Sequence, residues 1–320
     1  MPPEMPPSPP VLVTGGGGFI GSHILKELVH QELYTVNFDL SLLRNNAASE
    51  VLNEQEMANI HTVIGDITDF PALCRTLVEH RITHIIHLAA VLNDVSSSNP
   101  FYAAHVMNTG MLNVLEAMRI HKIQKVVWAS SMSVFDNYTD VMVTNDAPHD
   151  TKTVYGACKS WAEKIAEHYY RMWQVDSVGL RFGVTYGPGR LRGITKFATD
   201  IIRLPLLGQP FTFEYGNTRF DWQYVGDLAQ ATVVALRYEG AKPVRCFNLR
   251  GVEQSVSEVA ELVRKHILGA NIQLEHKAMK INPTGEDTLF FEHFGYRCHT
   301  TIEGAIAKMK EHDNKTSGGV

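Results

Sequence analysis

The chain has 320 residues, of which 44% are hydrophobic and 20% charged, as expected of a globular protein with a sizeable core. The net charge of −5 provides no basic surface for a phosphate backbone, and no apolar run is long enough to span a membrane. These features argue against nucleic acid and membrane partners. The N-terminal MPPEMPPSPP lacks a signal-peptide layout, and the four cysteines show no CxxC spacing. We therefore expect a cytoplasmic protein with reduced thiols and no metal site.

The first half of the chain alternates short apolar runs with helical patterns, as a parallel sheet with crossover helices requires. The apolar runs are continuous, which predicts strands covered on both faces. The pattern predicts strands at residues 11–15, 34–39, 60–66, 84–90, 125–131 and 178–183. It predicts helices at residues 21–31, 99–121 and 155–174.

The pattern changes after Gly187. The Gly- and Arg-rich loop GPGRLRG precedes a helical pattern at 194–207 and the aromatic, turn-rich segment QPFTFEYGNTRFDWQYVGD. CFNLRG, at 246–251, is typical of one more sheet strand, and a helix is expected at 257–268. We predict an α/β fold with a Rossmann-type, doubly wound parallel sheet and a smaller C-terminal substrate-binding lobe. The predicted division assigns residues 1–187 plus 223–251 to the nucleotide-binding domain and residues 188–222 plus 252–320 to the lobe.

The segment VLVTGGGGFIGSHI places Gly15, Gly18 and Gly21 at G-x-x-G-x-x-G spacing between a predicted strand and a predicted helix. Glycine lets a pyrophosphate approach the N–H groups at the helix N-terminus, where the helix dipole favours an anion. A glycine-rich turn can also serve only to pack a helix on a strand. Its position between the first strand and the first helix favours a dinucleotide site.

Asp39 ends the second predicted strand. A carboxylate at this position can accept hydrogen bonds from an adenosine ribose, and its negative charge would repel a 2′-phosphate. We therefore predict NAD rather than NADP as the cofactor. The alternative interpretation of Asp39 is a solvated loop acid.

Tyr155 and Lys159 lie four residues apart in a predicted helix, so their side chains share one face. This spacing is common and carries little weight alone. Ser131 adds a hydroxyl at the end of a strand, at the sheet edge where ligands of open α/β folds bind. Together they predict a hydride-transfer site. Lys159 holds the ribose hydroxyls and, with the positive nicotinamide, lowers the pKa of Tyr155; Tyr155 acts as general base, and Ser131 positions the developing carbonyl oxygen.

The chain resembles the extended short-chain dehydrogenases/reductases of the NAD-dependent epimerase/dehydratase type, the group that contains UDP-galactose 4-epimerase. The motifs run nearly end to end and include TGGGGFIG, GDITD, HLAA, NTGMLNVLEA, ASSMSVF, YGACK, LRFGVTYGPG and DWQYVGDLAQA. The resemblance implies a homodimer formed through helices like 99–121 and 155–174. It also implies further cofactor contacts from Phe19, Ile20, Asp66, Ile67, Leu88, Ala89, Ala90 and Phe182.

Four positions depart from the family pattern. Dehydrating members typically carry Asp-Glu directly after the catalytic hydroxyl, and decarboxylating members carry Glu two residues after it; here Met132 and Ser133 follow Ser131. Sugar-nucleotide epimerases usually have an Asn where this chain has Val184. They also have an Arg that grips the diphosphate where this chain has Phe220. A diphosphate-linked sugar is therefore a poorer fit.

The arginines nearby leave two alternatives open. Arg190, Arg192 or Arg219 could replace the missing diphosphate contact, or could hold a carboxylate on a smaller hydroxy acid; solvated loop arginines are the simpler interpretation. The residues expected to contact the substrate are Ser131, Ser133, Val184, Arg190, Arg192 and Phe220.

The preferred hypothesis is an NAD-dependent dehydrogenase that oxidises a secondary alcohol on a small polyhydroxylated or acidic, sugar-like substrate. The first alternative is an NAD-retaining epimerase of a sugar or nucleotide sugar, which uses the same catalytic residues. The second alternative is a non-catalytic NAD-binding scaffold. The intact set of Ser131, Tyr155 and Lys159 argues against the scaffold.

Overall fold

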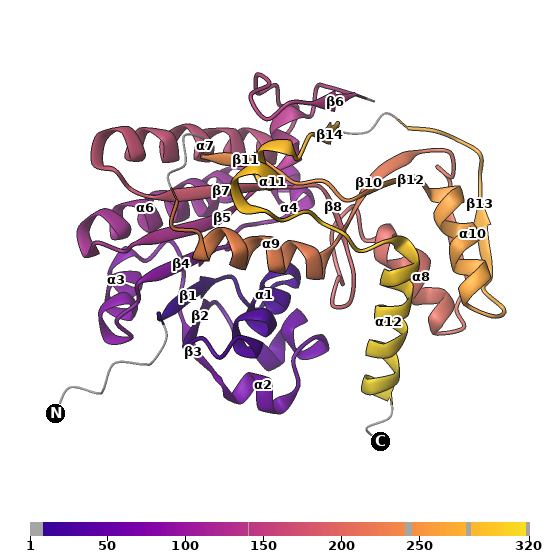
Figure 1. Ribbon diagram of the computed structural model, residues 1–320, viewed down its shortest axis with the longest axis horizontal. Helices are drawn as coiled ribbons and strands as arrows, with labels where there is room; N and C mark the ends of the chain where they lie inside the picture. Colours follow the sequence, from indigo (N-terminus) through magenta and orange to yellow (C-terminus); the bar gives the residue numbers. More distant parts are fainter. Residues whose placement is uncertain (1–8, 140, 241–244, 280–282, 318–320) are drawn as a thin grey trace.

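The computed structural model of the protein describes residues 9–139, 141–240, 245–279 and 283–317. Within these residues, parallel strands form a seven-stranded central sheet in the order β11–β7–β5–β4–β1–β2–β3 (Figure 1). This order is the doubly wound Rossmann arrangement, as predicted. The strands are β1 (Val11–Thr14), β2 (Thr35–Asp39), β3 (Ile60–Ile64), β4 (His84–His87), β5 (Lys125–Ser131), β7 (Ser177–Phe182) and β11 (Cys246–Asn248).

Helices cover both faces of this sheet. Side chains that alternate along β1 divide between the two faces: Val11 and Val13 pack with α1, α9 and α11, whereas Leu12 packs with α3, α6 and α7. All three of these β1 side chains are almost fully buried, which explains why the strands lack an apolar–polar alternation. The helices are α1 (Phe19–His30), α9 (Val225–Arg237) and α11 (Thr288–Phe294) on one face and α3 (Phe70–Glu79), α6 (Gly110–His121) and α7 (Val154–Trp173) on the other.

The direction in which the strands are added reverses at β1, which pairs with β2 on one side and with β4 on the other. The chain leaves both β1 and β4 at the same sheet edge, where the Leu88 N–H donates to the Thr14 carbonyl at 3.0 Å. Such a reversal opens a crevice beyond the carboxyl ends of the strands, where ligands of open α/β sheets bind.

A smaller lobe is built mainly from elements that follow β7, on the right of Figure 1. Its own apolar core includes Trp222, Ile201 and Ile306, all nearly inaccessible to solvent. The division at 1–187 plus 223–251 and 188–222 plus 252–320 stays a prediction. The lobe consists of a sheet of β8 (Val184–Tyr186), β10 (Arg219–Tyr224) and β12 (Val252–Ser255), a pair of strands β9 (Phe211–Phe213) and β13 (Ile272–Leu274), and the helices α8 (Phe197–Leu206), α10 (Val256–His266) and α12 (Ile302–Ser317).

Short elements connect these layers. The predicted helix at 99–121 is divided into α5, a π-helical turn at His105–Thr109 and α6; it begins where the Asn99 side chain accepts from the Tyr102 N–H. In the part of the chain that the structure describes, no helix combines the length and apolar character needed to cross a membrane. The remaining elements are α2 (Glu54–Ala58), α4 (Asn93–Ser98), α5 (Pro100–Ala104), β6 (Met142–Val143), β14 (Thr284–Gly285) and three 3₁₀ turns at Leu43–Asn45, Ala47–Glu50 and Met132–Phe135.

Candidate active site

A cavity of about 1250 Å³ follows the carboxyl edge of the sheet from the glycine loop to the smaller lobe. Its volume exceeds the roughly 300–1000 Å³ of an ordinary small-molecule pocket, so it can hold a dinucleotide and a second ligand together. The structure brings all the predicted site residues to its walls, while their individual roles stay predictions. They are Gly15, Gly18, Phe19, Ile20, Gly21, Asp39, Asp66, Ile67, Leu88, Ala89, Ala90, Ser131, Ser133, Tyr155, Lys159, Phe182, Val184, Arg190, Arg192 and Phe220.

The glycine loop packs so closely against neighbouring backbone atoms that side chains would not fit. Gly15 has a φ of +72°, and a Cβ there would lie 2.7 Å from the Ala89 nitrogen. A Cβ on Gly21 would lie 2.4 Å from the Gly15 carbonyl oxygen. Only glycine meets both demands. Gly18 is the N-cap of α1 and provides no side chain to occupy the first N–H groups of that helix, which leaves them available to an anion.

Acidic residues follow β2 and β3 along the same edge. The Asp39 carboxylate accepts from the Gly17 N–H at 2.9 Å, so the acid is tied to the glycine loop. Asp66 accepts from the backbone N–H and the hydroxyl of Thr68, each at 2.8 Å. The cavity wall here also includes residues of the two 3₁₀ turns after β2, which carry no motif and which the sequence analysis missed.

Ser131, Tyr155 and Lys159 meet across the cavity floor. Ser131 is the last residue of β5, and its Oγ accepts from the Ser133 N–H at 3.1 Å. Tyr155 and Lys159 lie in the first two turns of α7, and the Lys159 Nζ lies 5.6 Å from the centre of the Tyr155 ring. Lys159 also donates to the Ala129 carbonyl on β5. Strand β5 and helix α7 therefore bring the three predicted catalytic side chains together.

Burial affects the pKa values of both Tyr155 and Lys159. Burial raises the pKa of Tyr155, and the hydrogen bond with Ser131 and the charge of Arg190 oppose the rise. Desolvation therefore has the largest effect on the Tyr155 hydroxyl, and the lowering of its pKa by Lys159 together with the nicotinamide stays a prediction. Burial also lowers the pKa of Lys159 to about 8, while Cys158 and Glu163 act in the opposite direction.

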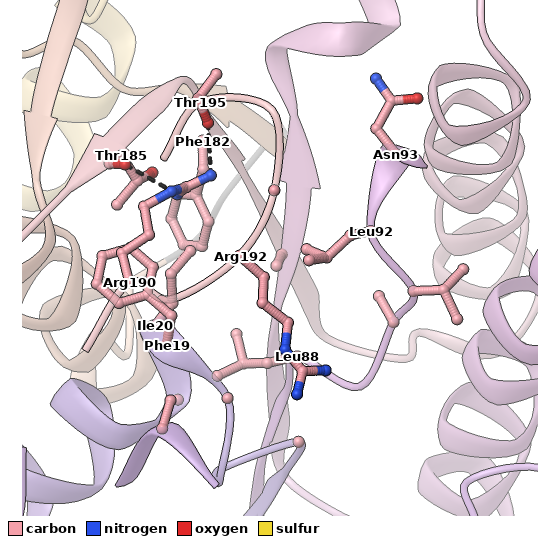
Figure 2. Close-up of a pocket in the computed structure, with 18 of the residues that line it drawn as sticks. Phe19, Ile20, Leu88, Leu92, Asn93, Phe182, Thr185, Arg190, Arg192 and Thr195 are labelled. Carbon is pink, nitrogen blue, oxygen red and sulfur yellow. Dashed lines mark hydrogen bonds between the residues drawn. The ribbon is translucent and has the colours of Figure 1, made fainter. Parts of the chain in front are cut away.

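Whereas Arg192 on the same loop is exposed, Arg190 lines the cavity and is half-buried (Figure 2). Its Nη1 donates to the Thr185 carbonyl at 2.9 Å and its Nη2 donates to the Thr195 hydroxyl. Its buried Nε has no hydrogen-bond partner, and no carboxylate of the described residues forms an ion pair with it. Burial lowers the pKa of Arg190 to about 10, which shows that its charge is poorly solvated.

The other two candidate arginines are placed differently. Arg192 is exposed and extends from its loop into the same cavity (Figure 2). Arg219 is held outside the cavity by Glu258, at 2.9 Å, and by Glu253, at 3.6 Å. Phe220, its neighbour in the chain, is buried and contributes to the cavity wall. Arg219 is not part of the cavity wall, because its side chain is on the opposite side of β10 from that of Phe220, whereas Arg190 and Arg192 line the cavity.

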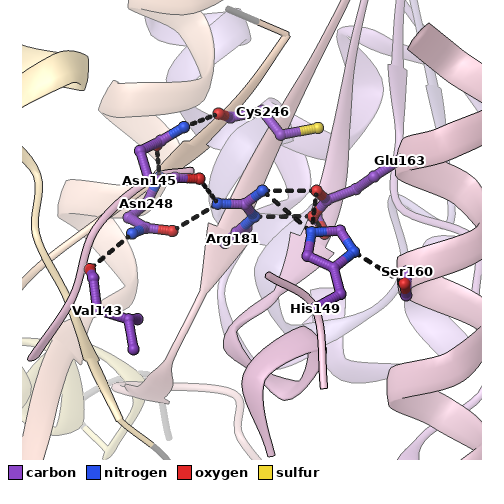
Figure 3. Close-up of polar contacts among 9 residues, drawn as sticks. Val143, Asn145, His149, Ser160, Glu163, Arg181, Cys246 and Asn248 are labelled. Carbon is purple, nitrogen blue, oxygen red and sulfur yellow. Dashed lines mark hydrogen bonds and ion pairs between the residues drawn. The ribbon is translucent and has the colours of Figure 1, made fainter. Parts of the chain in front are cut away.

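A buried polar network lies behind the three catalytic candidates (Figure 3). Glu163, two turns after Tyr155 on α7, accepts from Arg181 at 2.7 and 2.9 Å and from Ser130 at 2.5 Å. His149 lies 3.1 Å from the same carboxylate. Arg181 also donates to the Asn248 side chain at 2.9 Å. The network therefore joins α7 to strands β5, β7 and β11.

Glu163 is ionised at neutral pH in this network. Its hydrogen bonds and charge interactions with Arg181 and His149 outweigh the opposing effect of burial and lower its pKa to about 2. The sequence analysis missed Glu163, although its position four residues after Lys159 places both side chains on one helix face. Arg181 could not be paired with it from the sequence, because nothing local relates the two positions.

Histidines near the site are part of the packed structure. His87, on β4, is buried and its Nδ1 lies 2.7 Å from the Thr14 hydroxyl, and burial lowers its pKa to about 3. Among the residues that the structure describes, no three His, Cys, Asp or Glu side chains gather as a metal site would require.

A Rossmann sheet with Ser, Tyr and Lys at its carboxyl edge defines an extended short-chain dehydrogenase/reductase. The sequence profile of the NAD dependent epimerase/dehydratase family matches residues 11–270, and the chain belongs to that family. It is an NAD-dependent enzyme of the extended short-chain type, and NAD is its cofactor.

Individual relatives agree with this assignment. UDP-glucuronate 4-epimerase 3 of Arabidopsis thaliana is 30% identical over 332 residues, covering 93% of this chain and 75% of the relative. The Thermus thermophilus UDP-glucose 4-epimerase in complex with NAD superposes with a TM-score of 0.80 at 26% identity, covering 97% of this chain and all of that one. An L-threonine dehydrogenase from Cupriavidus necator gives a TM-score of 0.84 at 23% identity, covering 95% and 99% of the two chains, and supports the fold.

The residues on the cavity wall fit this cofactor. A pyrophosphate needs close approach to backbone N–H groups, and Gly15 and Gly18 leave that space at the start of α1. Asp39, fixed by the Gly17 N–H, would meet the adenosine ribose. Tyr155 and Lys159 would then lie beside the nicotinamide half, at the other end of the same edge.

Proposed function

We propose that the protein is an NAD-dependent dehydrogenase that oxidises a secondary alcohol on a small substrate bearing a carboxylate. The observation that carries this proposal is Arg190, a half-buried guanidinium on the cavity wall that has no ion pair among the described residues. An enclosed cation without a protein counter-ion favours an anionic ligand, because pairing offsets the cost of desolvation. Arg190 and Tyr155 line the same cavity, so one small ligand can present its carboxylate to the first and its hydroxyl to the second.

The side chains divide the reaction between them. Tyr155 accepts the proton of the substrate hydroxyl as the carbon–oxygen double bond forms, and the hydrogen on the carbon leaves with its electron pair. NAD, when bound, supplies the acceptor for that hydride. Ser131 donates to the substrate oxygen and holds it beside Tyr155. Lys159, fixed by the Ala129 carbonyl, holds the ribose and provides positive charge that stabilises the tyrosinate.

The test uses a panel of 2- and 3-hydroxy acids, sugar acids, polyols and nucleotide sugars, read by NADH absorbance and by NMR. Arg190→Met removes the proposed anion contact, and Arg219→Met removes an exposed arginine from the same lobe as a control. We expect Arg190→Met to lower kcat/KM for the acid by about 10- to 150-fold and to leave NAD affinity within threefold, because a hydrogen bond to a charged group contributes about 1.5–3 kcal/mol. Loss of NAD affinity with an unchanged KM for the acid would assign Arg190 to the cofactor instead.

An epimerase that oxidises and then reduces the same carbon is the second candidate. It is favoured by the similarity to UDP-glucuronate 4-epimerases, and the catalytic side chains are the same in both reactions. Val184 and Phe220 argue against it, because neither side chain can hydrogen-bond a sugar nucleotide. Inversion of UDP-glucuronate seen by NMR, with no net NADH, would establish the epimerase and exclude the dehydrogenase.

Three further statements stay predictions. We propose that the protein acts in the cytoplasm on a small molecule. We also propose a homodimer that pairs helices α5, α6 and α7 with those of a second copy. Exposed apolar side chains on this surface support the dimer, among them Phe101, Ile120, Met172 and Trp173. Light scattering would test the dimer, and a monomer at micromolar concentration would contradict it.

A further inference from the structure

Aromatic side chains of the smaller lobe form one wall of the cavity. Phe197 begins α8, Phe213 ends β9, Tyr215 follows β9 and Phe220 lies on β10; we call these four residues the aromatic wall. The ring centres of Phe197 and Phe213 lie 4.5 Å apart and nearly parallel, and those of Phe197 and Phe220 lie 5.0 Å apart. Tyr215 meets Phe213 edge to face at 5.9 Å. These contacts hold the rings in a fixed arrangement.

Other protein residues cover the aromatic wall only in part. Phe220 is buried, but Phe197, Phe213 and Tyr215 remain half-buried and all three line the cavity. Asp221 also lines the cavity. Its two carboxylate oxygens already accept from the Gln223 side chain and from the Gly251 N–H, each at 2.7 Å. The aromatic wall therefore presents mainly apolar surface to a ligand, and the hydrogen bonds of the neighbouring Asp221 are already made within the protein.

A short stretch of chain connects the aromatic wall to Thr195, the hydrogen-bond partner of Arg190. Thr195, which accepts from Arg190, lies two residues before Phe197. Arg190, Tyr155 and the four residues of the aromatic wall all line one cavity, so a ligand held by Arg190 and Tyr155 can extend its remaining substituent to the wall.

We propose that the aromatic wall is a substrate subsite for an apolar group, so that the substrates are hydroxy acids with an aromatic or branched aliphatic substituent. This inference rests on the proposed dehydrogenase function and names the substrate class for the same site. Burial of one phenyl or isobutyl group against such a wall raises kcat/KM by about 10- to 100-fold over a methyl group, when the gain is realised in the transition state.

A nucleobase is the competing occupant, since it too would stack on aromatic rings. A nucleotide substrate also brings a diphosphate, and the wall lacks the arginine with which sugar-nucleotide epimerases grip that group, although Arg190 and Arg192 line the same cavity. Phe220 stands where sugar-nucleotide epimerases carry their diphosphate-binding Arg, and the adjacent Arg219 is engaged by Glu258 and Glu253 outside the cavity. The wall residues themselves carry no cation.

The experiment compares 3-hydroxy acids that differ only in the substituent, methyl, isopropyl or phenyl, in the presence of NAD. We expect kcat/KM to rise at least tenfold from methyl to phenyl. Phe213→Ala, and independently Tyr215→Ala, should remove most of this preference while leaving kcat/KM for the methyl member within threefold. Phe291→Ala, which truncates an exposed ring on α11, serves as the control and should keep the preference.

The outcomes separate the two proposals. Turnover of the acids without a preference, or an equal loss for all members in both wall variants, would overturn the subsite and leave the dehydrogenase standing. Absence of turnover for every acid would overturn the proposed function and the subsite with it. Competition by UDP that is weakened by Phe213→Ala would show that the wall binds a nucleobase and would also overturn the inference.

Discussion

Replacement of Glu163 by Gln is the most direct test of the buried network behind the active site. Gln keeps the shape of the side chain but removes the charge that Arg181 and His149 face. Arg181 is only 4% exposed, so its guanidinium cannot recover hydration when its partner is neutral. Removal of one partner from a buried ion pair costs about 3–5 kcal/mol.

The cost converts into a measurable shift of the unfolding temperature. With an unfolding entropy of about 2.1 cal/mol/K per residue, 1 kcal/mol corresponds to about 1.5 °C in a chain of this length. Glu163→Gln should therefore lower Tm by about 5–8 °C at pH 7 in thermal unfolding followed by circular dichroism. Glu167→Gln, one turn further along α7, breaks an exposed pair with Arg171 at 3.7 Å and should change Tm by less than about 1 °C.

The pH dependence of this difference has a definite sign. Folding lowers the pKa of Glu163 from 4.5 to about 2, so its contribution is complete above pH 4.5 and is lost as the pH falls toward 2. The gap in Tm between the native protein and Glu163→Gln should therefore narrow across that window. Equal Tm values for Glu163→Gln and Glu167→Gln at pH 7 would refute the reasoning.

Three other predictions concern the cofactor and the reaction. Gly15→Ala places a Cβ against the Ala89 backbone at a positive φ, so calorimetry should show weaker NAD binding and a lower Tm; unchanged values would contradict the role of the close approach. Asp39→Ser removes the proposed ribose acceptor and the repulsion of a 2′-phosphate. Fluorescence titration should therefore show about tenfold weaker NAD binding and improved NADP binding; an unchanged preference for NAD over NADP would exclude this role. Tyr155→Phe should reduce kcat by at least about 100-fold and leave the Kd for NAD within threefold; full activity would rule out Tyr155 as the base.

Much of the larger domain was predictable because its signals are local. The strand at 125–131 matches β5 residue for residue, and α7 begins at Val154, where the Thr153 side chain accepts from the Gly156 N–H. The segment 60–66 was predicted to extend beyond β3, which ends at Ile64, because an apolar run does not show where pairing with a neighbour stops.

The smaller lobe was less predictable. Its strands β9 and β10 lie in the segment that was described only as aromatic and turn-rich, since three to six residues carry too little periodicity to identify a strand. The contacts of Arg190 with Thr185 and Thr195 depend on how the loop folds back on β8. No sequence spacing indicates that geometry, so its lack of an ion pair could be seen only in three dimensions.

The proposed reacting groups and the proposed substrate-binding groups lie on different segments of the chain, which has an evolutionary consequence. The groups proposed to move protons are on strand β5 and on helix α7, which packs against the central sheet. Arg190 is on the loop after β8, and Phe213 ends the short strand β9 of the smaller lobe. Sequence drift in those segments can exchange one substrate for another without disturbing the reacting groups. A library of variants with substitutions confined to residues 184–220 should therefore be an efficient source of new substrate specificities.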